Sequence, residues 1–277
     1  MEKLLVVDGS NLLFQMYFGM PARIVNHQGK AIQGTLGFVG ALLKIVRRVA
    51  PTHVAVLFDG ACRNPRKELD ESYKANRPDW EETEETPFDQ LPDIYAALDH
   101  LGIPHRETEC CEADDWIAGY ALTWENDAVV ASFDSDFFQL ITDKVHILRY
   151  RGERTVICDP AWLKEKYGIT PGQYAAFKAL TGDTADNIPG IPGVGPKTAA
   201  ALLQQFGSLQ TLLDGAENIK RPSVREAVIR NRDRLQLNHL LIRLEAGETL
   251  PFTKEELAWA DPGITTTEVL QAIGLKE

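Results

Sequence analysis

The chain has 277 residues, enough for one large domain or two small ones with a real hydrophobic core. Hydrophobic residues make up 44% of it and charged residues 25%, which excludes a disordered, collagen-like or low-complexity chain. No apolar run approaches the roughly 18 residues that span a bilayer. The N-terminal stretch lacks the features of a signal peptide. We therefore expect a cytoplasmic protein with no membrane contact, whose four cysteines are reduced thiols.

The formal net charge of −11 argues, taken alone, against a nucleic-acid partner, because phosphates attract basic surfaces. Net charge does not say where the charges lie. If many of the acids cluster in one metal site, the remaining surface is close to neutral or locally basic.

Three short apolar runs end in carboxylates. They are residues 4–7 before Asp8, 54–58 before Asp59, and 128–133 before Asp134 and Asp136. The runs do not alternate with polar residues, which indicates buried parallel strands. Helical patterns lie between them, so the sequence predicts an α/β fold with helices at 35–49, 88–101 and 113–124. Functional sites form at the carboxyl ends of parallel strands, so these aspartates are expected to converge.

Two stretches interrupt this alternation. Residues 63–87 have mixed charge and little apolar periodicity, which fits an exposed excursion or a solvated linker face equally well. From residue 171 onward the pattern is helical, with helices predicted at 171–181, 196–206 and 224–242. We expect an α/β part at 1–170 and a helical part at 171–277.

Nine carboxylates fall at turns and element ends: Asp8, Asp59, Glu112, Asp114, Asp115, Asp134, Asp136, Asp183 and Asp186. Converging anions repel one another strongly at low dielectric, and only bound cations make such a cluster tolerable. Oxygen ligands suit magnesium or manganese, and two such ions activate a water and stabilise the leaving oxygen of a phosphodiester. Each group has a simpler local explanation, because carboxylates also cap helices and occupy turns.

The helical part contains a glycine-rich turn before a helix start. Gly190, Gly193 and Gly195 allow tight turns, and Pro196 suits the first helical turn. Lys197 and Thr198 then lie at a helix N-terminus, where phosphate binds without sequence preference and loop carbonyls could hold potassium. An ordinary capped helix corner is the alternative. The basic stretch 220–234 is either a second backbone contact or a solvated helix face.

These motifs together resemble the 5′-nuclease (flap endonuclease) family, in particular the bacterial forms that are free-standing 5′–3′ exonucleases or the N-terminal domain of DNA polymerase I. The resemblance extends from Leu4 to about Ile242. Seven pieces in the same order carry it: VVDGSNLLF, LFDG, SYKANR, CEADD, FDSDFFQL, ALTGDTADNIPG and GVGPKTAAALL.

The resemblance implies a PIN-like core, a helical arch and a helix–three-turn–helix DNA-binding motif. The nine carboxylates match the family's metal ligands for two or more Mg²⁺ or Mn²⁺ ions, with Asp183 and Asp186 closing the site from the helical side. The arch falls on residues 63–87, named here the arch segment. There Tyr73, Lys74 and Arg77 match stacking and scissile-phosphate residues, and Arg66 matches another arch arginine. Catalytic roles fall to Lys74, Arg77, Asp59 and Asp134. Duplex and K⁺ binding fall to the turn and helix start: Gly193, Gly195, Lys197 and Thr198.

The implied activity is structure-selective hydrolysis of branched or 5′-ended DNA in replication and repair, by a monomer with a DNA polymerase as a candidate partner. The sequence departs from the family at Gln15, where bacterial members often carry a DNA-contacting arginine, and at Pro65, Leu36 and the acidic run Glu81 to Glu85. Two alternatives remain open: a structure-selective DNA-binding protein with weak or no catalysis, and an RNA-directed PIN-like nuclease.

Overall fold

The structure is a computed structural model that describes residues 2–60, 65–76, 85–109, 111–244 and 249–277. Its centre is a six-stranded sheet with the strand order β3-β2-β1-β4-β5-β6. Every neighbouring pair is parallel except β5 and β6. This confirms the predicted α/β class with a mostly parallel sheet. The strands are β1 (Lys3–Asp8), β2 (His53–Phe58), β3 (His105–Glu107), β4 (Asp127–Ala131), β5 (Val145–Arg149) and β6 (Val156–Cys158).

The central strand β1 is buried on both faces, which explains why its sequence is uniformly apolar. Leu4 and Val6 face one hydrophobic cluster, while Leu5 and Val7 face the other. All four side chains are fully buried. Successive strand side chains point to opposite faces, so this single run supplies both layers of the core.

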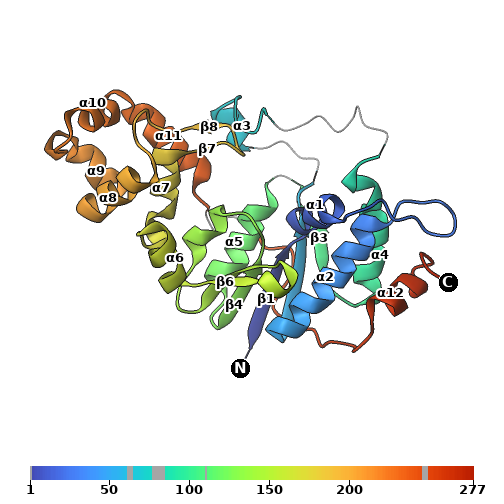
Figure 1. Cartoon of the computed structure of the whole chain (residues 1–277). Coiled ribbons are helices and arrows are strands. Elements are labelled where there is room, and N and C mark those ends of the chain that lie inside the picture. The colour runs from blue at the N-terminus through green and yellow to red at the C-terminus, as the bar shows by residue number, and fades with distance from the viewer. Residues whose placement is uncertain (1, 61–64, 77–84, 110, 245–248) are drawn as a thin grey trace.

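Helices cover the two faces of the sheet (Figure 1). The side of Leu5 and Val7 is packed by α1 (Gly9–Gly19), α2 (Gln33–Val49), α4 (Leu91–His100) and α12 (Thr266–Ala272). The side of Leu4 and Val6 is packed by α5 (Ala113–Thr123), and the same cluster continues into α6 (Pro160–Tyr167) and α7 (Tyr174–Thr181). The α/β part and the helical part therefore share one continuous core.

The remaining helices are α3 (Pro65–Leu69), α8 (Pro196–Phe206), α9 (Leu209–Asp214), α10 (Pro222–Arg230) and α11 (Arg232–Ile242). The single helix predicted at 224–242 is wrong, because α10 and α11 meet at Asn231, whose φ of −108° and ψ of 24° are not helical. The Asn231 side chain donates to the Ala227 carbonyl at 2.8 Å, a local bond that competes with helix continuation. The helical part also contains a two-residue strand pair, β7 (Gly182–Asp183) with β8 (Ile188–Pro189).

The last part of the chain returns to the α/β part. The Val54 amide donates to the Leu257 carbonyl at 2.9 Å, and the Trp259 amide donates to the Thr52 carbonyl at 2.9 Å. Val269 of α12 joins the cluster on the α2 face. The division of the chain at residue 170 stays a prediction, and the residues from 257 onward lie on the α/β core (Figure 1).

None of the helices in the described ranges is long and apolar enough to cross a bilayer. Cys111 and Cys158 are buried, whereas Cys62 and Cys110 lie outside the described residues.

Candidate metal centre and active site

The first carboxylate lies where β1 passes into α1. Asp8 is 5% exposed and caps the helix, because its side chain accepts from the Asn11 amide at 2.9 Å. The Ser132 hydroxyl donates to the other Asp8 oxygen at 2.8 Å. The capping explanation is thus correct for Asp8, but it leaves this carboxylate buried at the carboxyl edge of the sheet.

Neighbouring strand ends bring Asp59 and Asp134 to the same edge. Asp59 accepts from the Ala113 amide, the first residue of α5, at 2.9 Å. A side chain is excluded at the next position, Gly60, because a Cβ there would lie 1.9 Å from the Thr108 carbonyl oxygen. The predicted strand 128–133 ends earlier, at Ala131, and the following turn is closed by the Asp134 amide donating to the Ser132 hydroxyl at 2.9 Å.

Asp8, Asp59, Asp114 and Asp134, named here the inner group, act on one another electrostatically. Burial raises the pKa of Asp8 to about 7, and the charges of Asp59 and Asp134 add to that increase. Burial also raises the pKa of Asp114 well above its ordinary value, again with a contribution from the other three carboxylates. The structure therefore brings these four predicted ligands, from four separate segments, within strong mutual repulsion.

Asp136, Asp183 and Asp186, named here the outer group, can present one oxygen each within 4.8 Å of one another. Burial and the charge of Asp134 raise the pKa of Asp136 to about 8, although Lys178 opposes the change. The Nζ atom of Lys178 lies 3.3 Å from Asp136 Oδ1 and pairs with Asp183. Asp136 Oδ1 is nevertheless buried without a hydrogen-bond partner.

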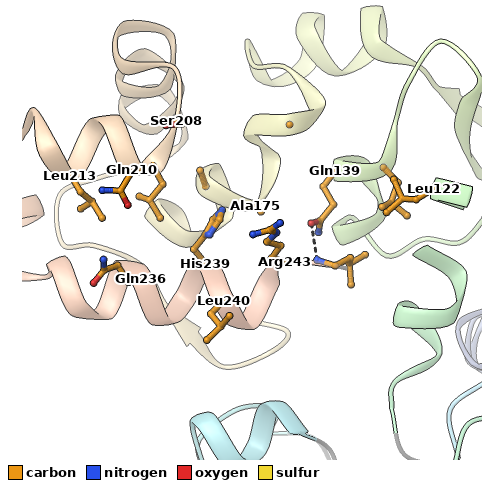
Figure 2. A pocket seen from close by; sticks show the side chains of 15 residues that line it. Leu122, Gln139, Ala175, Ser208, Gln210, Leu213, Gln236, His239, Leu240 and Arg243 are labelled. Carbon is orange, nitrogen blue, oxygen red and sulfur yellow. Dashed lines mark hydrogen bonds between the residues drawn. The ribbon is translucent and has the colours of Figure 1, made fainter. Parts of the chain in front are cut away.

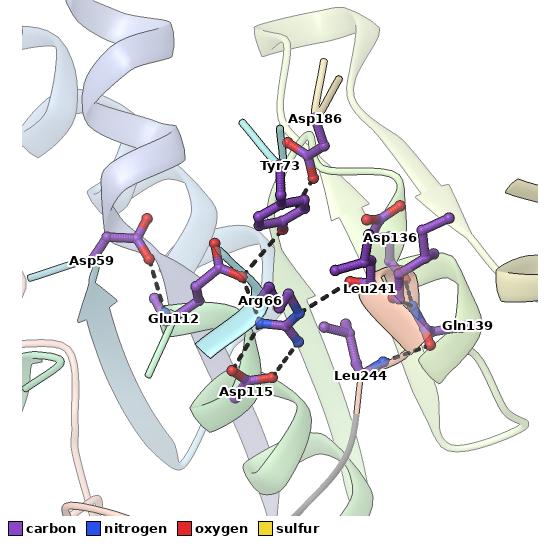
Figure 3. A network of polar contacts seen from close by, with 12 residues as sticks. Asp59, Arg66, Tyr73, Glu112, Asp115, Asp136, Gln139, Asp186, Leu241 and Leu244 are labelled. Carbon is purple, nitrogen blue, oxygen red and sulfur yellow. Dashed lines mark hydrogen bonds and ion pairs between the residues drawn. The ribbon is translucent and has the colours of Figure 1, made fainter. Parts of the chain in front are cut away.

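The last two predicted ligands contact the arch segment (Figure 3). Arg66 donates to Glu112 at 2.5 Å and to Asp115 at 2.7 and 3.1 Å, and its Nε donates to the Leu241 carbonyl of α11 at 3.0 Å. Lys74 also pairs with Glu112. Burial raises the pKa of Glu112, but Lys74 and Arg66 outweigh it, so the net pKa lies below its ordinary value.

Tyr73 connects the carboxylate groups. Its side chain is 3% exposed, and its hydroxyl donates to Glu112 at 3.3 Å and to Asp186 at 3.4 Å. The residue predicted to stack on substrate thus points into the carboxylates in this structure (Figure 3). Its neighbour Lys74 has a positive φ of 56°, and its amide donates to the Asp186 carbonyl at 3.0 Å.

This donor set fits divalent metal ions. All of the side chains offer carboxylate oxygens, which suit hard cations such as Mg²⁺ or Mn²⁺ better than zinc. One buried oxygen of Asp136 lacks a hydrogen bond, and two aspartates have pKa values raised to about 7 and about 8. A cation between the carboxylates would relieve both features.

The residues predicted to grip DNA lie apart from the carboxylates, around the start of α8. Gly193 has a φ of 80°, in the left-handed region that favours glycine, and Gly195 is the N-cap. Lys197 is exposed, Thr198 is half-buried, and Lys197 lines a cavity of about 270 Å³ together with Lys166.

Some predicted features cannot be placed. Arg77 and the acidic residues Glu81 to Glu84 lie outside the described residues. Glu85, the last of the acidic run, pairs with Arg23. In the basic stretch 220–234, Arg232 and Arg234 form ion pairs with Asp214 and Asp70, so part of that stretch serves internal contacts.

Sequence reasoning missed Ser132 and Lys178. Ser132 stands directly before the FDSD motif, and its hydroxyl links Asp8 to Asp134. Lys178 is the single charged residue in helix α7, which is the sequence signal that could have singled it out. A separate cavity of about 710 Å³ holds none of the carboxylates (Figure 2); its lining includes Leu122, His239, Leu240 and Arg243.

Comparison with known proteins agrees with this architecture. Residues 3–168 match the model of the 5′-3′ exonuclease N-terminal resolvase-like domain, and residues 169–264 match the 5′-3′ exonuclease C-terminal SAM fold. The chain therefore belongs to the 5′-3′ exonuclease family.

Curated relatives include DNA polymerase I of Rhizobium leguminosarum, 37% identical over 270 residues, which cover 92% of this chain and 26% of that protein. The thermostable DNA polymerase I of Thermus aquaticus is 36% identical over 242 residues, covering 85% of this chain and 28% of that protein. The chain thus spans about a quarter of the length of these relatives.

Solved structures share the fold at low sequence identity. A bacteriophage T5 flap endonuclease in complex with DNA and metal ions gives a TM-score of 0.70 at 22% identity, covering 87% of this chain and 89% of that one. The catalytic core of Rad2 in complex with a DNA substrate gives a TM-score of 0.63 at 16% identity. The match covers 99% of this chain and 88% of that one. Both likenesses support the α/β fold described above.

The raised pKa values of Asp8 and Asp136 predict an unusual pH dependence. The folded protein binds their protons more tightly than the unfolded chain does, so stability falls as pH rises from about 4 to about 8. Thermal unfolding in EDTA measures this fall, and the double variant Asp8→Asn/Asp136→Asn should be less sensitive to pH over that range. A wild-type melting temperature that rises over the same interval would contradict the assignment.

The ion pairs of Lys178 predict that the free energy of unfolding depends on metal binding. Burial lowers the pKa of Lys178, but Asp136 and Asp183 outweigh this, so it stays charged as the counterion of the outer group. Lys178→Met should cost about 3–5 kcal/mol of unfolding free energy in EDTA, because it leaves buried charge unpaired. Saturating Mn²⁺ should recover part of the loss. The matched control is Lys164→Met, at an exposed position, and equal losses with and without Mn²⁺ would refute the coupling.

Proposed function

We propose that this protein is a structure-selective 5′-nuclease, which hydrolyses phosphodiesters of branched or 5′-ended DNA in replication and repair by 5′–3′ exonuclease and 5′-flap endonuclease action. The main evidence for this proposal is that carboxylates from separate segments converge at the carboxyl edge of a parallel sheet. Membership of the 5′-3′ exonuclease family supports the same activity.

The metal ions in this proposal are Mg²⁺ or Mn²⁺, two or more in number. The inner group, with Glu112 and Asp115, would hold one set of positions, and the outer group would hold another. Bound divalent ions supply electrostatic stabilisation of a phosphodiester and lower the pKa of water. Asp59 and Asp134 are the inner carboxylates to which we assign catalytic roles.

The arch segment supplies the cations that would face the scissile phosphate. Lys74 and Arg66 already point at Glu112, so their positive charges lie beside the candidate metal ligands. We assign Lys74 and Arg77 to the scissile phosphate, Arg66 to the 5′ strand, and Tyr73 to stacking on it. That role for Tyr73 requires it to leave the Glu112 and Asp186 contacts when DNA binds.

The start of α8 would hold the duplex. Gly193 and Gly195 let the backbone approach a phosphate closely, and Lys197 and Thr198 add polar contacts at the helix N-terminus. A K⁺ ion held by this turn is part of the proposal. These contacts read the backbone and not the bases, so selectivity should follow DNA shape. We further propose that the protein acts as a monomer, with a DNA polymerase as partner.

The test is cleavage of a labelled 5′-flap DNA by wild type and by Asp134→Asn, with Asp143→Asn, an exposed loop position, as the matched control. Wild type and control should cut near the flap junction with Mg²⁺ or Mn²⁺ and not with EDTA. Asp134→Asn should lose about 10³-fold or more in turnover while still binding the flap, since it removes an inner carboxylate.

Retained turnover in Asp134→Asn would contradict its assigned role. Flap binding without cleavage in wild type, with either metal, would favour a structure-selective DNA-binding protein. Preferential cleavage of an RNA of the same shape would favour an RNA-directed nuclease.

A further inference from the structure

A cluster of arginines lies at the end of β5 and on the turn that joins it to β6. Arg149, Arg151 and Arg154, named here the arginine hairpin, stand within six residues beside a single acid, Glu153. The chain as a whole carries a net charge of −11, so the positive net charge of this segment is opposite in sign to that of the whole chain. Arg151 and Arg154 are exposed, and Arg149 is half-buried.

The arginine hairpin lies next to the inner group. Arg149 donates through Nη2 to the Phe133 carbonyl at 3.0 Å. The guanidinium groups of Arg149 and Arg151 lie 5.0 and 4.9 Å from the centre of the Phe133 ring. Phe133 directly precedes Asp134, so the positive charges are anchored one residue from a candidate metal ligand.

The turn that carries these arginines is held in place. Gln15 of α1 donates to the Tyr150 carbonyl at 2.7 Å. The Arg151 amide donates to the Thr155 hydroxyl at 3.1 Å, and that hydroxyl donates to the Gly152 carbonyl at 2.6 Å. Arg151 thus extends from a backbone with fixed hydrogen bonds, which lowers the entropy lost when a ligand is bound.

Other cations near the carboxylates are already neutralised. Arg66, Lys74 and Lys178 each form ion pairs with candidate metal ligands. By contrast, no carboxylate in the described part of the chain pairs with Arg149, Arg151 or Arg154. The positive charge of the arginine hairpin therefore stays available for an external anion.

We propose that the arginine hairpin is an additional binding surface for nucleic-acid phosphates, with Arg151 and Arg154 as the contacts. This rests on the proposed nuclease function and adds a surface beyond the arch segment and the start of α8. Guanidinium groups bind phosphate oxygens in bidentate fashion and read no sequence. An acidic centre repels a polyanion, so flanking positive charge is what brings a phosphodiester to it. Arg149 is a positioning residue that holds Phe133 and the turn leading to Asp134.

The test is binding of 5′-flap DNA in EDTA by fluorescence anisotropy across a series of salt concentrations. The double variant Arg151→Ala/Arg154→Ala should raise Kd about tenfold or more, since charge-assisted contacts are lost. The slope of log K against log salt concentration should be smaller in magnitude by about 1.8, because each of the two lost phosphate contacts contributes about 0.9. The charge-conserving variant Arg151→Lys/Arg154→Lys should keep most of the slope. Arg47→Ala, at an exposed arginine of α2 outside every segment assigned to DNA, is the matched control.

Cleavage rates over a range of DNA concentrations, up to saturation, separate this proposal from the proposed function. With Mg²⁺, the alanine variant should show a raised KM and a kcat within about twofold of wild type, because the two removed side chains bind DNA but are not assigned to the scissile phosphate. Unchanged Kd and salt slope would overturn the proposal, and so would a lost kcat with an unchanged Kd. A wild-type protein that binds the flap but does not cut it would instead overturn the nuclease function and leave the binding test standing.

Discussion

Repulsion between buried carboxylates is the constraint on which the rest of this structure depends. Four aspartates of the inner group and three of the outer group are fixed by strand ends, a helix start and a short loop. Without cations, burial keeps Asp8 and Asp136 partly protonated near neutral pH, with pKa values raised to about 7 and about 8. Such groups cost stability, because buried charge loses its hydration. A fold that gathers them at one edge is organised around the binding of cations.

The chain supplies its own cations, and these connect its parts. Arg66 of the arch segment contacts Glu112 and Asp115 and also reaches the Leu241 carbonyl of α11. Lys178 of α7 contacts Asp136 and Asp183. Because breaking a buried ion pair costs far more than an exposed one, these contacts hold the helical part and the arch segment against the sheet. The same contacts place positive charge where a phosphodiester must approach.

The sequence was sufficient for the α/β class, for the three strands β1, β2 and β4 and for the convergence of the carboxylates. Apolar runs without alternation indicate buried parallel strands, and such strands end at one edge of the sheet. It did not predict β3, β5 and β6, which are short or lie toward the edges of the sheet. It was not sufficient for the break at Asn231 or for the return of the chain after Leu257, since a local pattern does not record which distant element covers a face. The sequence also did not predict the carboxylates that Tyr73 and Lys178 contact. Both side chains are buried against carboxylates more than four residues away, and only tertiary packing decides such contacts.

The most direct test of this account is anomalous diffraction from crystals soaked in Mn²⁺. The account predicts manganese peaks within about 2–2.6 Å of carboxylate oxygens in both the inner and the outer group, the range for hard cations bound by oxygen. It also predicts that Lys178 Nζ moves away from Asp136. Crystals that show no peak at either group, with Arg66 and Lys178 still paired to the carboxylates, would contradict the claim that the fold is organised around divalent metal.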